Sequence, residues 1–364
     1  MLTWQKASLA AVAISMVVAG LPAMTANAAS PIVPYGAIGA EWNAKGGAAG
    51  FLGQPLDNES DVAGVPGART EDFAGGSIYW SLPTGAHEIH GYILAEYVGA
   101  AGGPTVYGLP LTDETTTPDG IGRYNHFTGG RSIYWTAATG AHAIYGSIRG
   151  DYAATGWERG PLGYPVSDEF DVYGATTSPV REQYFQWGAE VWSPATGAHE
   201  MHGAILLWYY SHGQAAGLMG LPTTDETSTP DGVGRYNNFT GGVLVWTPTT
   251  DVHEVHGSIL GEWNATGRGA GVTGYPVTDE MTTPDGVGRF NHFSKGGSIY
   301  WTPATGAHEV HGAIRDAWAA TGWELGPLGY PTSDEFAIPN GRQSTFQHGY
   351  ITWSPEGGVN VVVR

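Results

Sequence analysis

An aliphatic and an aromatic residue recur four positions apart at six places along the chain. Because residues four apart lie on one face of an α-helix, each pair predicts a short helix of two or three turns. Glycine-rich segments such as 267–269 follow the pairs and are typical of helix ends. The six pairs are Ile38 and Trp42, Ile93 and Tyr97, Ile148 and Tyr152, Ile205 and Tyr209, Ile259 and Trp263, and Ile314 and Trp318.

The segment after each predicted helix has the alternation of a β-sheet. In the second copy, residues 123–127, 132–135 and 139–142 read as strand-like segments, and the links between them contain glycine. Glycine-containing links between alternating segments are hairpin signals. We therefore expect a small antiparallel meander of three or four strands after each helix.

A tetrapeptide, x-Gly-x-Pro, marks the period of this pattern. Its six copies are 52–55, 107–110, 162–165, 219–222, 273–276 and 328–331, with successive glycines 55, 55, 57, 54 and 55 residues apart. So regular a period indicates one small unit copied six times, each burying its open faces against its neighbours. The predicted fold is mainly β with short helices, in six tandem units of about 55 residues stacked as an elongated stalk. A closed six-bladed propeller is the alternative.

The predicted boundaries follow from the helix starts. The six repeats span 29–90, 91–145, 146–202, 203–256, 257–311 and 312–364. Residues 1–28 stand apart: Lys6 precedes an apolar run from Ala7 to Met24, and Ala26-Asn27-Ala28 follows it. This is the layout of a secretory signal peptide, which predicts export; a retained membrane anchor is the alternative, but Ser8, Ser15 and Pro22 interrupt the run.

Composition narrows the class of partner. The chain has no cysteine, so stability must come from packing between units and not from disulfides. Its net charge is −19, and loss of the signal with Lys6 makes it −20, which disfavours binding to nucleic acid or anionic lipid. Only 13% of residues are charged, so the surface is polar mainly through uncharged groups and suits a neutral, hydroxyl-rich partner.

The repeated motif resembles a known family. Leu-Gly-x-Pro-x-x-Asp-Glu, then Asp-Gly-x-Gly-Arg-Tyr, then Gly-Gly-Ser-Ile-Tyr-Trp and Thr-Gly-Ala-His are similar to the LGFP repeat of actinobacterial cell-envelope proteins, from about Gly36 to the C-terminus. The resemblance implies small β-rich units in tandem and attachment to the peptidoglycan-arabinogalactan wall. No copy here spells Leu-Gly-Phe-Pro, since Tyr, Leu or Gln takes the position of Phe.

One arginine and one glutamate occur in every copy. The arginines are Arg69, Arg123, Arg181, Arg235, Arg289 and Arg342, and the glutamates are Glu59, Glu114, Glu169, Glu226, Glu280 and Glu335. Guanidinium and carboxylate form a planar pair, so we expect each arginine to meet the glutamate of its own copy. The pair then either pins the x-Gly-x-Pro loop to the sheet or points into a pocket and grips a ligand.

A tryptophan follows the same sixfold rule, at Trp80, Trp135, Trp192, Trp246, Trp301 and Trp353, whereas the preceding residue varies. Neighbours in a strand face opposite sides, so the invariant side is expected to be core and the variable side solvent. On that interpretation Tyr79, Tyr134 and Tyr300 are the candidates for an exposed surface that stacks on sugars. A stacking role for the tryptophans is the alternative.

Histidine pairs suggest a rival chemistry. His87 and His90, His199 and His202, His253 and His256, and His308 and His311 each form His-x-x-His. On a strand, residues three apart face opposite sides, so one pair does not chelate a metal, and we expect structural histidines and no metal site. The Pro-Asp-Gly segments at Asp119, Asp231 and Asp285 offer too few ligands for calcium and are interpreted as turns.

These observations favour a secreted, non-catalytic protein without cofactors. No cysteine nucleophile or Gly-x-Ser-x-Gly motif occurs, and the acidic residues recur with the repeat instead of forming one unique centre. The expected function is multivalent attachment to wall polysaccharide, arabinogalactan or peptidoglycan, with no nucleic-acid partner and no membrane span after signal cleavage. The alternative is a structural or protein-interaction scaffold that recruits an envelope enzyme.

Overall fold

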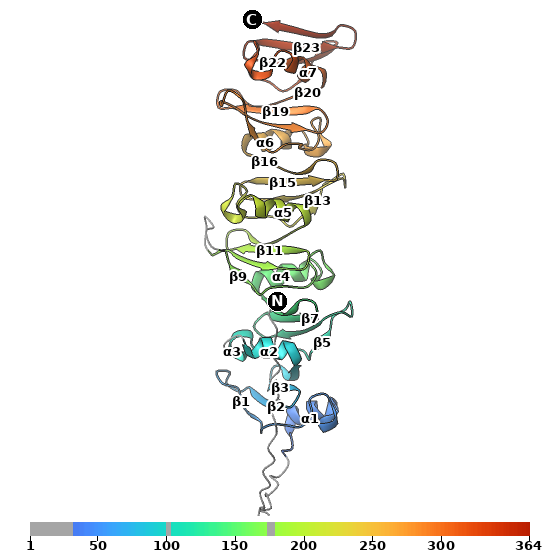
Figure 1. The fold of residues 1–364 in the computed structure, drawn as a ribbon, viewed down its shortest axis with the longest axis vertical. Coiled ribbons are helices and arrows are strands. Elements are labelled where there is room, and N and C mark those ends of the chain that lie inside the picture. Colours follow the sequence, from blue (N-terminus) through green and yellow to red (C-terminus); the bar gives the residue numbers. More distant parts are fainter. Residues whose placement is uncertain (1–31, 100–102, 173–178) are drawn as a thin grey trace, which may run out of the picture.

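The protein is a column of six sheets that follow one another along its long axis. The computed structural model describes residues 32–99, 103–172 and 179–364, and the predicted signal peptide lies outside these residues. Helices lie between successive sheets from α1 at one end to the C-terminus at the other (Figure 1). The predicted stalk of β-rich repeats is therefore confirmed, and the described sheets do not close into a propeller.

Each repeat contributes a four-stranded antiparallel meander in sequence order. The strands of the first three sheets are β1 (Ser60–Asp61), β2 (Arg69–Phe73), β3 (Gly76–Ser81) and β4 (Gly85–His90); β5 (Thr115–Thr116), β6 (Arg123–Phe127), β7 (Arg131–Thr136) and β8 (Gly140–Tyr145); and β9 (Phe170–Asp171), β10 (Arg181–Tyr184), β11 (Gly188–Ser193) and β12 (Gly197–His202). Those of the last three are β13 (Thr227–Ser228), β14 (Arg235–Asn238), β15 (Gly242–Thr247) and β16 (Asp251–His256); β17 (Met281–Thr282), β18 (Arg289–Phe293), β19 (Gly297–Thr302) and β20 (Gly306–His311); and β21 (Phe336–Ile338), β22 (Gly341–Phe346), β23 (Gly349–Ser354) and β24 (Gly358–Val363).

A short helix precedes each sheet, as the aliphatic–aromatic spacing predicts. The helices are α1 (Gly36–Ala44), α2 (Gly91–Gly99), α4 (Gly146–Ala154), α5 (Gly203–Ser211), α6 (Gly257–Ala265) and α7 (Gly312–Ala320), with α3 (Pro104–Tyr107) as an extra turn in the second repeat. Five repeats also have a single 3₁₀ turn after the helix, at Gly47–Ala49, Trp157–Arg159, Gln214–Ala216, Arg268–Ala270 and Trp323–Leu325.

The glycine that opens each helix is required by the backbone. Gly91 has φ 55° and Gly312 has φ 53°, a left-handed conformation at the corner between strand and helix. A Cβ at either position would meet no atom within 4 Å, so the constraint is conformational and not one of space. The helix therefore turns back over its sheet at the same angle in every copy.

In five of the six helices the aromatic residue donates a hydrogen bond to the glycine carbonyl of the x-Gly-x-Pro loop, and Tyr209 is the exception. In the fifth repeat Trp263 is buried, and its Nε1 donates to the carbonyl of Gly274 in the x-Gly-x-Pro loop at 2.9 Å. Tyr97 donates to the carbonyl of Gly108 in the same way at 2.7 Å. Tyrosine and tryptophan combine large apolar area with a donor, so one side chain fills the core and fixes the loop.

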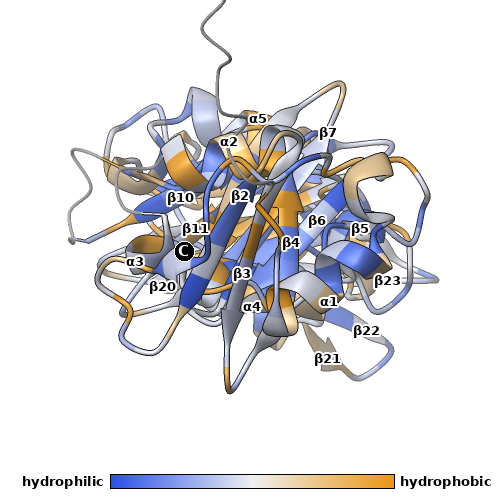
Figure 2. Ribbon diagram, turned by 90° about the horizontal axis from the view of Figure 1, so that it is seen from below, coloured by the Kyte–Doolittle hydropathy of each residue, from blue (hydrophilic) through white to orange (hydrophobic). Residues whose placement is uncertain are grey.

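Most of the hydrophobic core lies where one repeat meets the next, and the cluster around Ile38 and Ile78 lies within the first repeat. One cluster joins Tyr79 and Ile89 of the first sheet to Ile93 and Tyr97 of α2 and to Ile133 of the second sheet. Figure 2, which looks along the column, shows the strands of the first sheet crossing its middle. Because the inner sheets bury both faces against neighbouring repeats, a single unit would lose much of its core, and the repeats stabilise one another. At the end of the column β24 is largely exposed.

Polar bonds also cross each junction. Asn125 of β6 is fully buried and donates from Nδ2 to the carbonyls of Glu88, in the previous sheet, and Thr112, at 3.2 and 2.9 Å. Asn237 and Asn291 repeat this geometry in later copies. The described helices include none that is long and apolar enough to cross a membrane.

Candidate functional site

The arginine–glutamate pair predicted from the sequence forms in five copies. Nε of Arg69 lies 2.7 Å from Glu59, that of Arg123 2.5 Å from Glu114, that of Arg181 2.6 Å from Glu169 and that of Arg342 2.8 Å from Glu335, and Arg235 pairs with Glu226. In the fifth copy Arg289 donates to Thr282 instead. These glutamate side chains are 5–13% exposed and their arginines 28–40% exposed, so the carboxylate is inside and the guanidinium at the surface.

The guanidinium also binds the backbone of its partner. Nη2 of Arg123 donates to the carbonyl of Glu114 at 2.9 Å, and Arg342 does the same to Glu335 at 2.8 Å. The pair therefore ties the acidic segment that follows the x-Gly-x-Pro loop to the second strand of the sheet. At the surface, Nη1 of Arg123 also donates to the hydroxyl of Thr116 at 3.0 Å.

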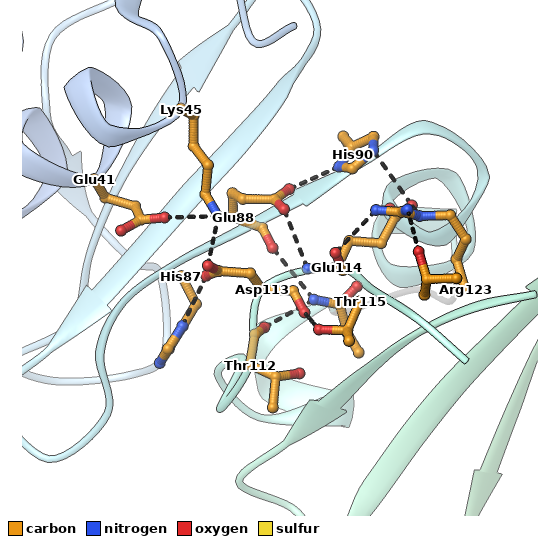
Figure 3. Close-up of polar contacts among 12 residues, drawn as sticks. Glu41, Lys45, His87, Glu88, His90, Thr112, Asp113, Glu114, Thr115 and Arg123 are labelled. Atoms are coloured by element: carbon orange, nitrogen blue, oxygen red, sulfur yellow. Dashed lines mark hydrogen bonds and ion pairs between the residues drawn. The ribbon is translucent and has the colours of Figure 1, made fainter. Parts of the chain in front are cut away.

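The second histidine of each His-x-x-His pair connects two repeats. Nδ1 of His90 lies 2.7 Å from Glu88, and its Nε2 lies 3.3 Å from Glu114, which belongs to the next repeat (Figure 3). Glu88 in turn accepts the backbone N–H of Glu114 at 3.1 Å. Histidine, two carboxylates and Arg123 thus form one network at the junction.

The electrostatics of this network favour a charged histidine. The hydrogen bond that His256 donates to Glu254 raises the pKa of His256, and the bond from His311 to Glu309 raises the pKa of His311; burial opposes the shift in both. Burial also raises the pKa of Glu114 and of Glu280, partly offset by the neighbouring histidine. The site is therefore a mixture of cationic and anionic groups that can both donate and accept hydrogen bonds.

The tryptophan lies on the same face as the arginine. The strand register places Arg289 opposite Trp301 and Arg342 opposite Trp353, and all six copies share this pairing. A cavity of about 240 Å³ in the fifth copy and one of about 250 Å³ in the sixth are bordered by the histidine, the first turn of the helix, the glutamate, the arginine and the tryptophan. The members of the two sets are His256, Glu280, Arg289 and Trp301, and His311, Glu335, Arg342 and Trp353.

The predicted orientation of the aromatic residues was wrong. Tyr79, Tyr134 and Tyr300 are 7, 3 and 3% exposed and face the helix of the next repeat, whereas the tryptophans are only partly buried. The prediction assumed that one face of each sheet meets water. In a stack both faces are covered, so a variable position reflects packing against a different neighbour and not exposure. The tyrosines cannot form a sugar-stacking surface, and the tryptophans become the candidates.

One copy shows how a ring sits on this tryptophan. Tyr92, the second residue of α2, stacks on Trp135 with ring centroids 5.5 Å apart and planes 5° apart. Ser258 and Ala313 hold the corresponding position in the fifth and sixth repeats, where they line the cavities. The second site is therefore covered by the chain itself, in the geometry expected for a flat ligand.

The first histidine of each pair has a structural role. Nδ1 of His87 lies 2.9 Å from Asp113 and its Nε2 3.0 Å from the carbonyl of Thr84. His308 repeats the arrangement with Asp334 at 2.9 Å. Both ring nitrogens are thus occupied, and within the described residues no group of three or more His, Asp or Glu side chains is arranged to hold a metal ion.

The Asp-Gly turns are also joined to the following repeat. Asp119 accepts the N–H of Ile121 at 2.9 Å, as expected of a turn, and it accepts the hydroxyl of Tyr164 at 2.7 Å. Tyr164 belongs to the x-Gly-x-Pro loop of the next copy. The same bond joins Tyr275 to Asp231 and Tyr330 to Asp285, and this link was missed at the sequence level.

Comparison with solved structures yields matches of very low similarity. The extracellular domain of a putative one-component system of B. thetaiotaomicron is 12% identical with a TM-score of 0.16; the match covers 82% of this chain, which spans about a third (35%) of that one. The WD40 repeats of RRP9 are 12% identical with a TM-score of 0.12, covering 81% and 76% of the two chains. At such scores the likeness carries no argument about fold or function. No curated protein sequence matches the chain.

The family comparison is decisive. The model of the LGFP repeat matches six times, at residues 52–105, 108–160, 162–217, 219–271, 274–326 and 328–364, and no catalytic family accompanies it. LGFP repeats are associated with the cell envelope. The matches cover most of the chain, and the six sheets follow the same period. The chain therefore belongs to the LGFP repeat family.

Proposed function

We propose that this protein is a secreted, non-catalytic component of the cell envelope that attaches to the wall polysaccharide through several equivalent sites. The observation that carries the proposal is the cavity that the fifth and sixth copies share, bordered by a tryptophan, an arginine, a glutamate and a histidine. The cell-envelope association of the family supports the location.

The chemistry of the cavity suits a sugar. An indole face packs against the apolar C–H face of a sugar ring, and the neighbouring guanidinium and carboxylate bind its hydroxyl groups. In the sixth copy Trp353 supplies the indole, Arg342 the donors and Glu335 the acceptors. The stacking of Tyr92 on Trp135 supports this mode, because a ring already lies parallel to the tryptophan there.

Multiple weak sites fit the column. Successive repeats follow one another along one axis (Figure 1). Because the same residue types recur in them, we expect a long polymer to meet several cavities at once. Linking binding sites raises the effective concentration at the second site, and total affinity exceeds that of one contact by factors of roughly 10² to 10⁴. We expect binding to depend steeply on the number of intact cavities.

Co-sedimentation of the mature chain with protein-free wall tests the proposal. We expect retention by peptidoglycan-arabinogalactan and loss of retention when arabinogalactan is stripped. Retention by both polymers would indicate that the protein recognises peptidoglycan. Retention by neither would overturn wall binding and favour the scaffold function.

Variants of the tryptophans tie retention to the cavities. The double variant Trp301→Ala/Trp353→Ala should weaken retention about tenfold or more, because two of the linked sites lose their stacking surface. Trp135→Ala is the matched control: its ring is covered by Tyr92, so retention should hardly change. Tyr92→Ala should instead open that site and strengthen retention. Circular dichroism on each variant confirms that the column is intact.

A further inference from the structure

A cavity of a different kind lies at another level of the column. Between the fourth and fifth repeats, a hollow of about 270 Å³ is lined mainly by Tyr236, Val245, Trp263, Arg268 and Tyr275. It lies away from the tryptophan–arginine cavities described above, because it borders the 3₁₀ turn after α6 and not the first turn of the helix. Three of its walls are aromatic, so it is suited to a flat apolar ring.

Two other repeats fill the corresponding space with their own side chain. The position of Arg268 is held by Trp157 in the third repeat and by Trp323 in the sixth. The indole of Trp157 packs against Tyr134 and Tyr152, with centroids 6.1 and 5.6 Å away. The backbone is the same in all three, with φ of 54° at Arg268, 55° at Trp157 and 58° at Trp323.

The outer face of each of these indoles is covered by a cation. The guanidinium of Arg149 lies 5.1 Å from the ring of Trp157, and that of Arg315 lies 5.0 Å from Trp323. The indole is therefore enclosed between an aromatic wall and an arginine. These two repeats show that the space accommodates an indole ring between aromatic side chains and a guanidinium.

The fourth–fifth junction has the same backbone conformation but no indole ring in the corresponding space. Val245 stands where Tyr134 and Tyr300 stand in the filled junctions, which widens the hollow. Arg268 supplies the guanidinium, which lies 5.7 Å from the ring of Tyr236 and 5.8 Å from that of Trp263. Its Nε donates to Asn264 at 2.5 Å, which ties the arginine to the end of α6 at the edge of the cavity.

We propose that this cavity is a receptor for one aromatic side chain, a tryptophan carried on an exposed segment of a partner protein. The partner's indole takes the place that Trp157 and Trp323 occupy in their own repeats, against Trp263 and Tyr236. The guanidinium of Arg268, which lies over these two rings in the empty cavity, swings outward and covers the other face of the bound indole. The cavity then recruits a protein at one defined level of the column, independently of any wall polysaccharide bound at the repeated sites.

The chemistry sets an order of preference among aromatic rings. A guanidinium interacts more strongly with the face of an indole than with a phenol or a phenyl ring. Small probes should therefore bind in the order N-acetyl-tryptophanamide, N-acetyl-tyrosinamide, N-acetyl-phenylalaninamide. Methyl glycosides should not bind at this cavity, because the oxygens of its polar lining residues, Asp231 and Asn264, already accept hydrogen bonds from Tyr275 and Arg268.

Saturation-transfer NMR and calorimetry with N-acetyl-tryptophanamide on the full mature chain test the proposal. We expect one saturable site, and at least tenfold weaker binding in Arg268→Trp, where the chain fills its own cavity. This variant should fold, because two repeats already carry tryptophan at the same φ. Arg268→Ala should weaken binding by about two- to fivefold, as expected for loss of one cation–π contact.

A reciprocal variant guards against an indirect effect. Trp323→Ala vacates the corresponding space in the sixth repeat and should create a second site for the same probe, as engineered apolar cavities bind aromatic molecules. Three results would each overturn the proposal: no saturable binding by the wild-type chain, binding that persists in Arg268→Trp, or equal competition by methyl glycosides. Wall retention, measured separately, should be unchanged in Arg268→Trp, so failure here is distinguishable from failure of wall binding.

Discussion

The junction between the fifth and sixth repeats and the junction between the fourth and fifth share one backbone and differ in their filling. In the former, Trp323 packs against Tyr300 and Trp318, with centroids 6.2 and 5.1 Å away. In the latter, Arg268 and Val245 leave a hollow of about 270 Å³. The frame of the repeat is fixed by its glycines, its strand register and its helix, so side chains at a junction can change without disturbing the column.

The largest expected effect is the loss of stability when Trp323, which fills the fifth–sixth junction, is replaced. Trp323→Ala deletes a partly buried indole and leaves a cavity, and we expect a loss of about 2–3 kcal/mol, the lower end for a large aromatic because the ring is not fully buried. Arg268→Ala at the other junction should cost less than about 1 kcal/mol, since no packed core is lost. Hydrogen exchange of β23 and β19 amides measures the two junctions separately. Equal losses would show that the hollow junction is packed as tightly as the filled one.

The two junctions should also differ in their response to pH. Glu262 of α6 faces His308 and Asp334, and its pKa is raised to about 7, first by burial and then by the charge of Asp334. Trp208 holds the corresponding position in α5, so the fourth–fifth junction lacks this carboxyl. A carboxyl whose folded pKa is raised favours the folded state while protonated, and this advantage is lost as pH rises from about 4.5 to about 7.

The hydrogen bond that His308 donates to Asp334 raises the pKa of His308, so the stabilisation from this bond is complete below about pH 6.5 and is lost as pH rises further. The raised pKa of Glu262 and the raised pKa of His308 therefore both make the folded state less stable as pH rises. We expect the fifth–sixth junction to lose about 1–2 kcal/mol between pH 4.5 and 7, after allowance for solvent screening at a partly exposed site. Glu262→Gln should remove most of this slope, as measured by denaturant unfolding across the pH range. An unchanged slope would place its origin elsewhere.

Filling the hollow should stabilise the column modestly. Arg268→Trp places at the fourth–fifth junction the residue that the third and sixth repeats carry, and cavity filling at a compatible site adds about 1 kcal/mol. Arg268→Lys is the control, because it keeps the charge without filling the space. Thermal unfolding compares the variants. A destabilised Arg268→Trp would mean that Val245 leaves too little support for the ring.

The sequence predicted the repeat architecture that the two junctions share, but not the hollow that distinguishes them. The helices and the antiparallel strands follow from local spacing, and the structure confirms them; the arginine–glutamate pair also follows from it and forms in five of the six copies. The hollow does not follow, because its size depends on Val245 and Arg268 together, which lie in different repeats and meet only when the repeats are stacked. The same cause inverted the aromatic prediction: Tyr134 and Trp135 are neighbours in one strand, but both sides of that strand are covered by other repeats.

One signal of stacking was present in the sequence. An Asp-Gly turn at Asp119, Asp231 or Asp285 is followed in the next copy by tyrosine at the third position of x-Gly-x-Pro, at Tyr164, Tyr275 and Tyr330. Copies that follow a repeat without this turn have leucine there, at Leu109 and Leu221. The hydrogen bonds between these partners explain the correlation and also why this chain carries tyrosine where the family motif has phenylalanine.

Removing the hydroxyls of these tyrosines should have the smallest effect on stability at the two junctions. Tyr330 donates to Asp285 at 2.6 Å and lies 2.8 Å from the hydroxyl of Thr283, so Tyr330→Phe should cost about 1–2 kcal/mol at the filled junction. At the hollow junction Tyr275 makes its bond to Asp231, and it also lines the cavity, where the ring can adjust; Tyr275→Phe should cost about 1 kcal/mol or less. The amides of Val287 and Val233, which donate to the two aspartates, report on each turn through hydrogen exchange. If both substitutions accelerate exchange equally, the turns are linked to the next repeat with equal strength, and the difference between the junctions is confined to the cavity itself.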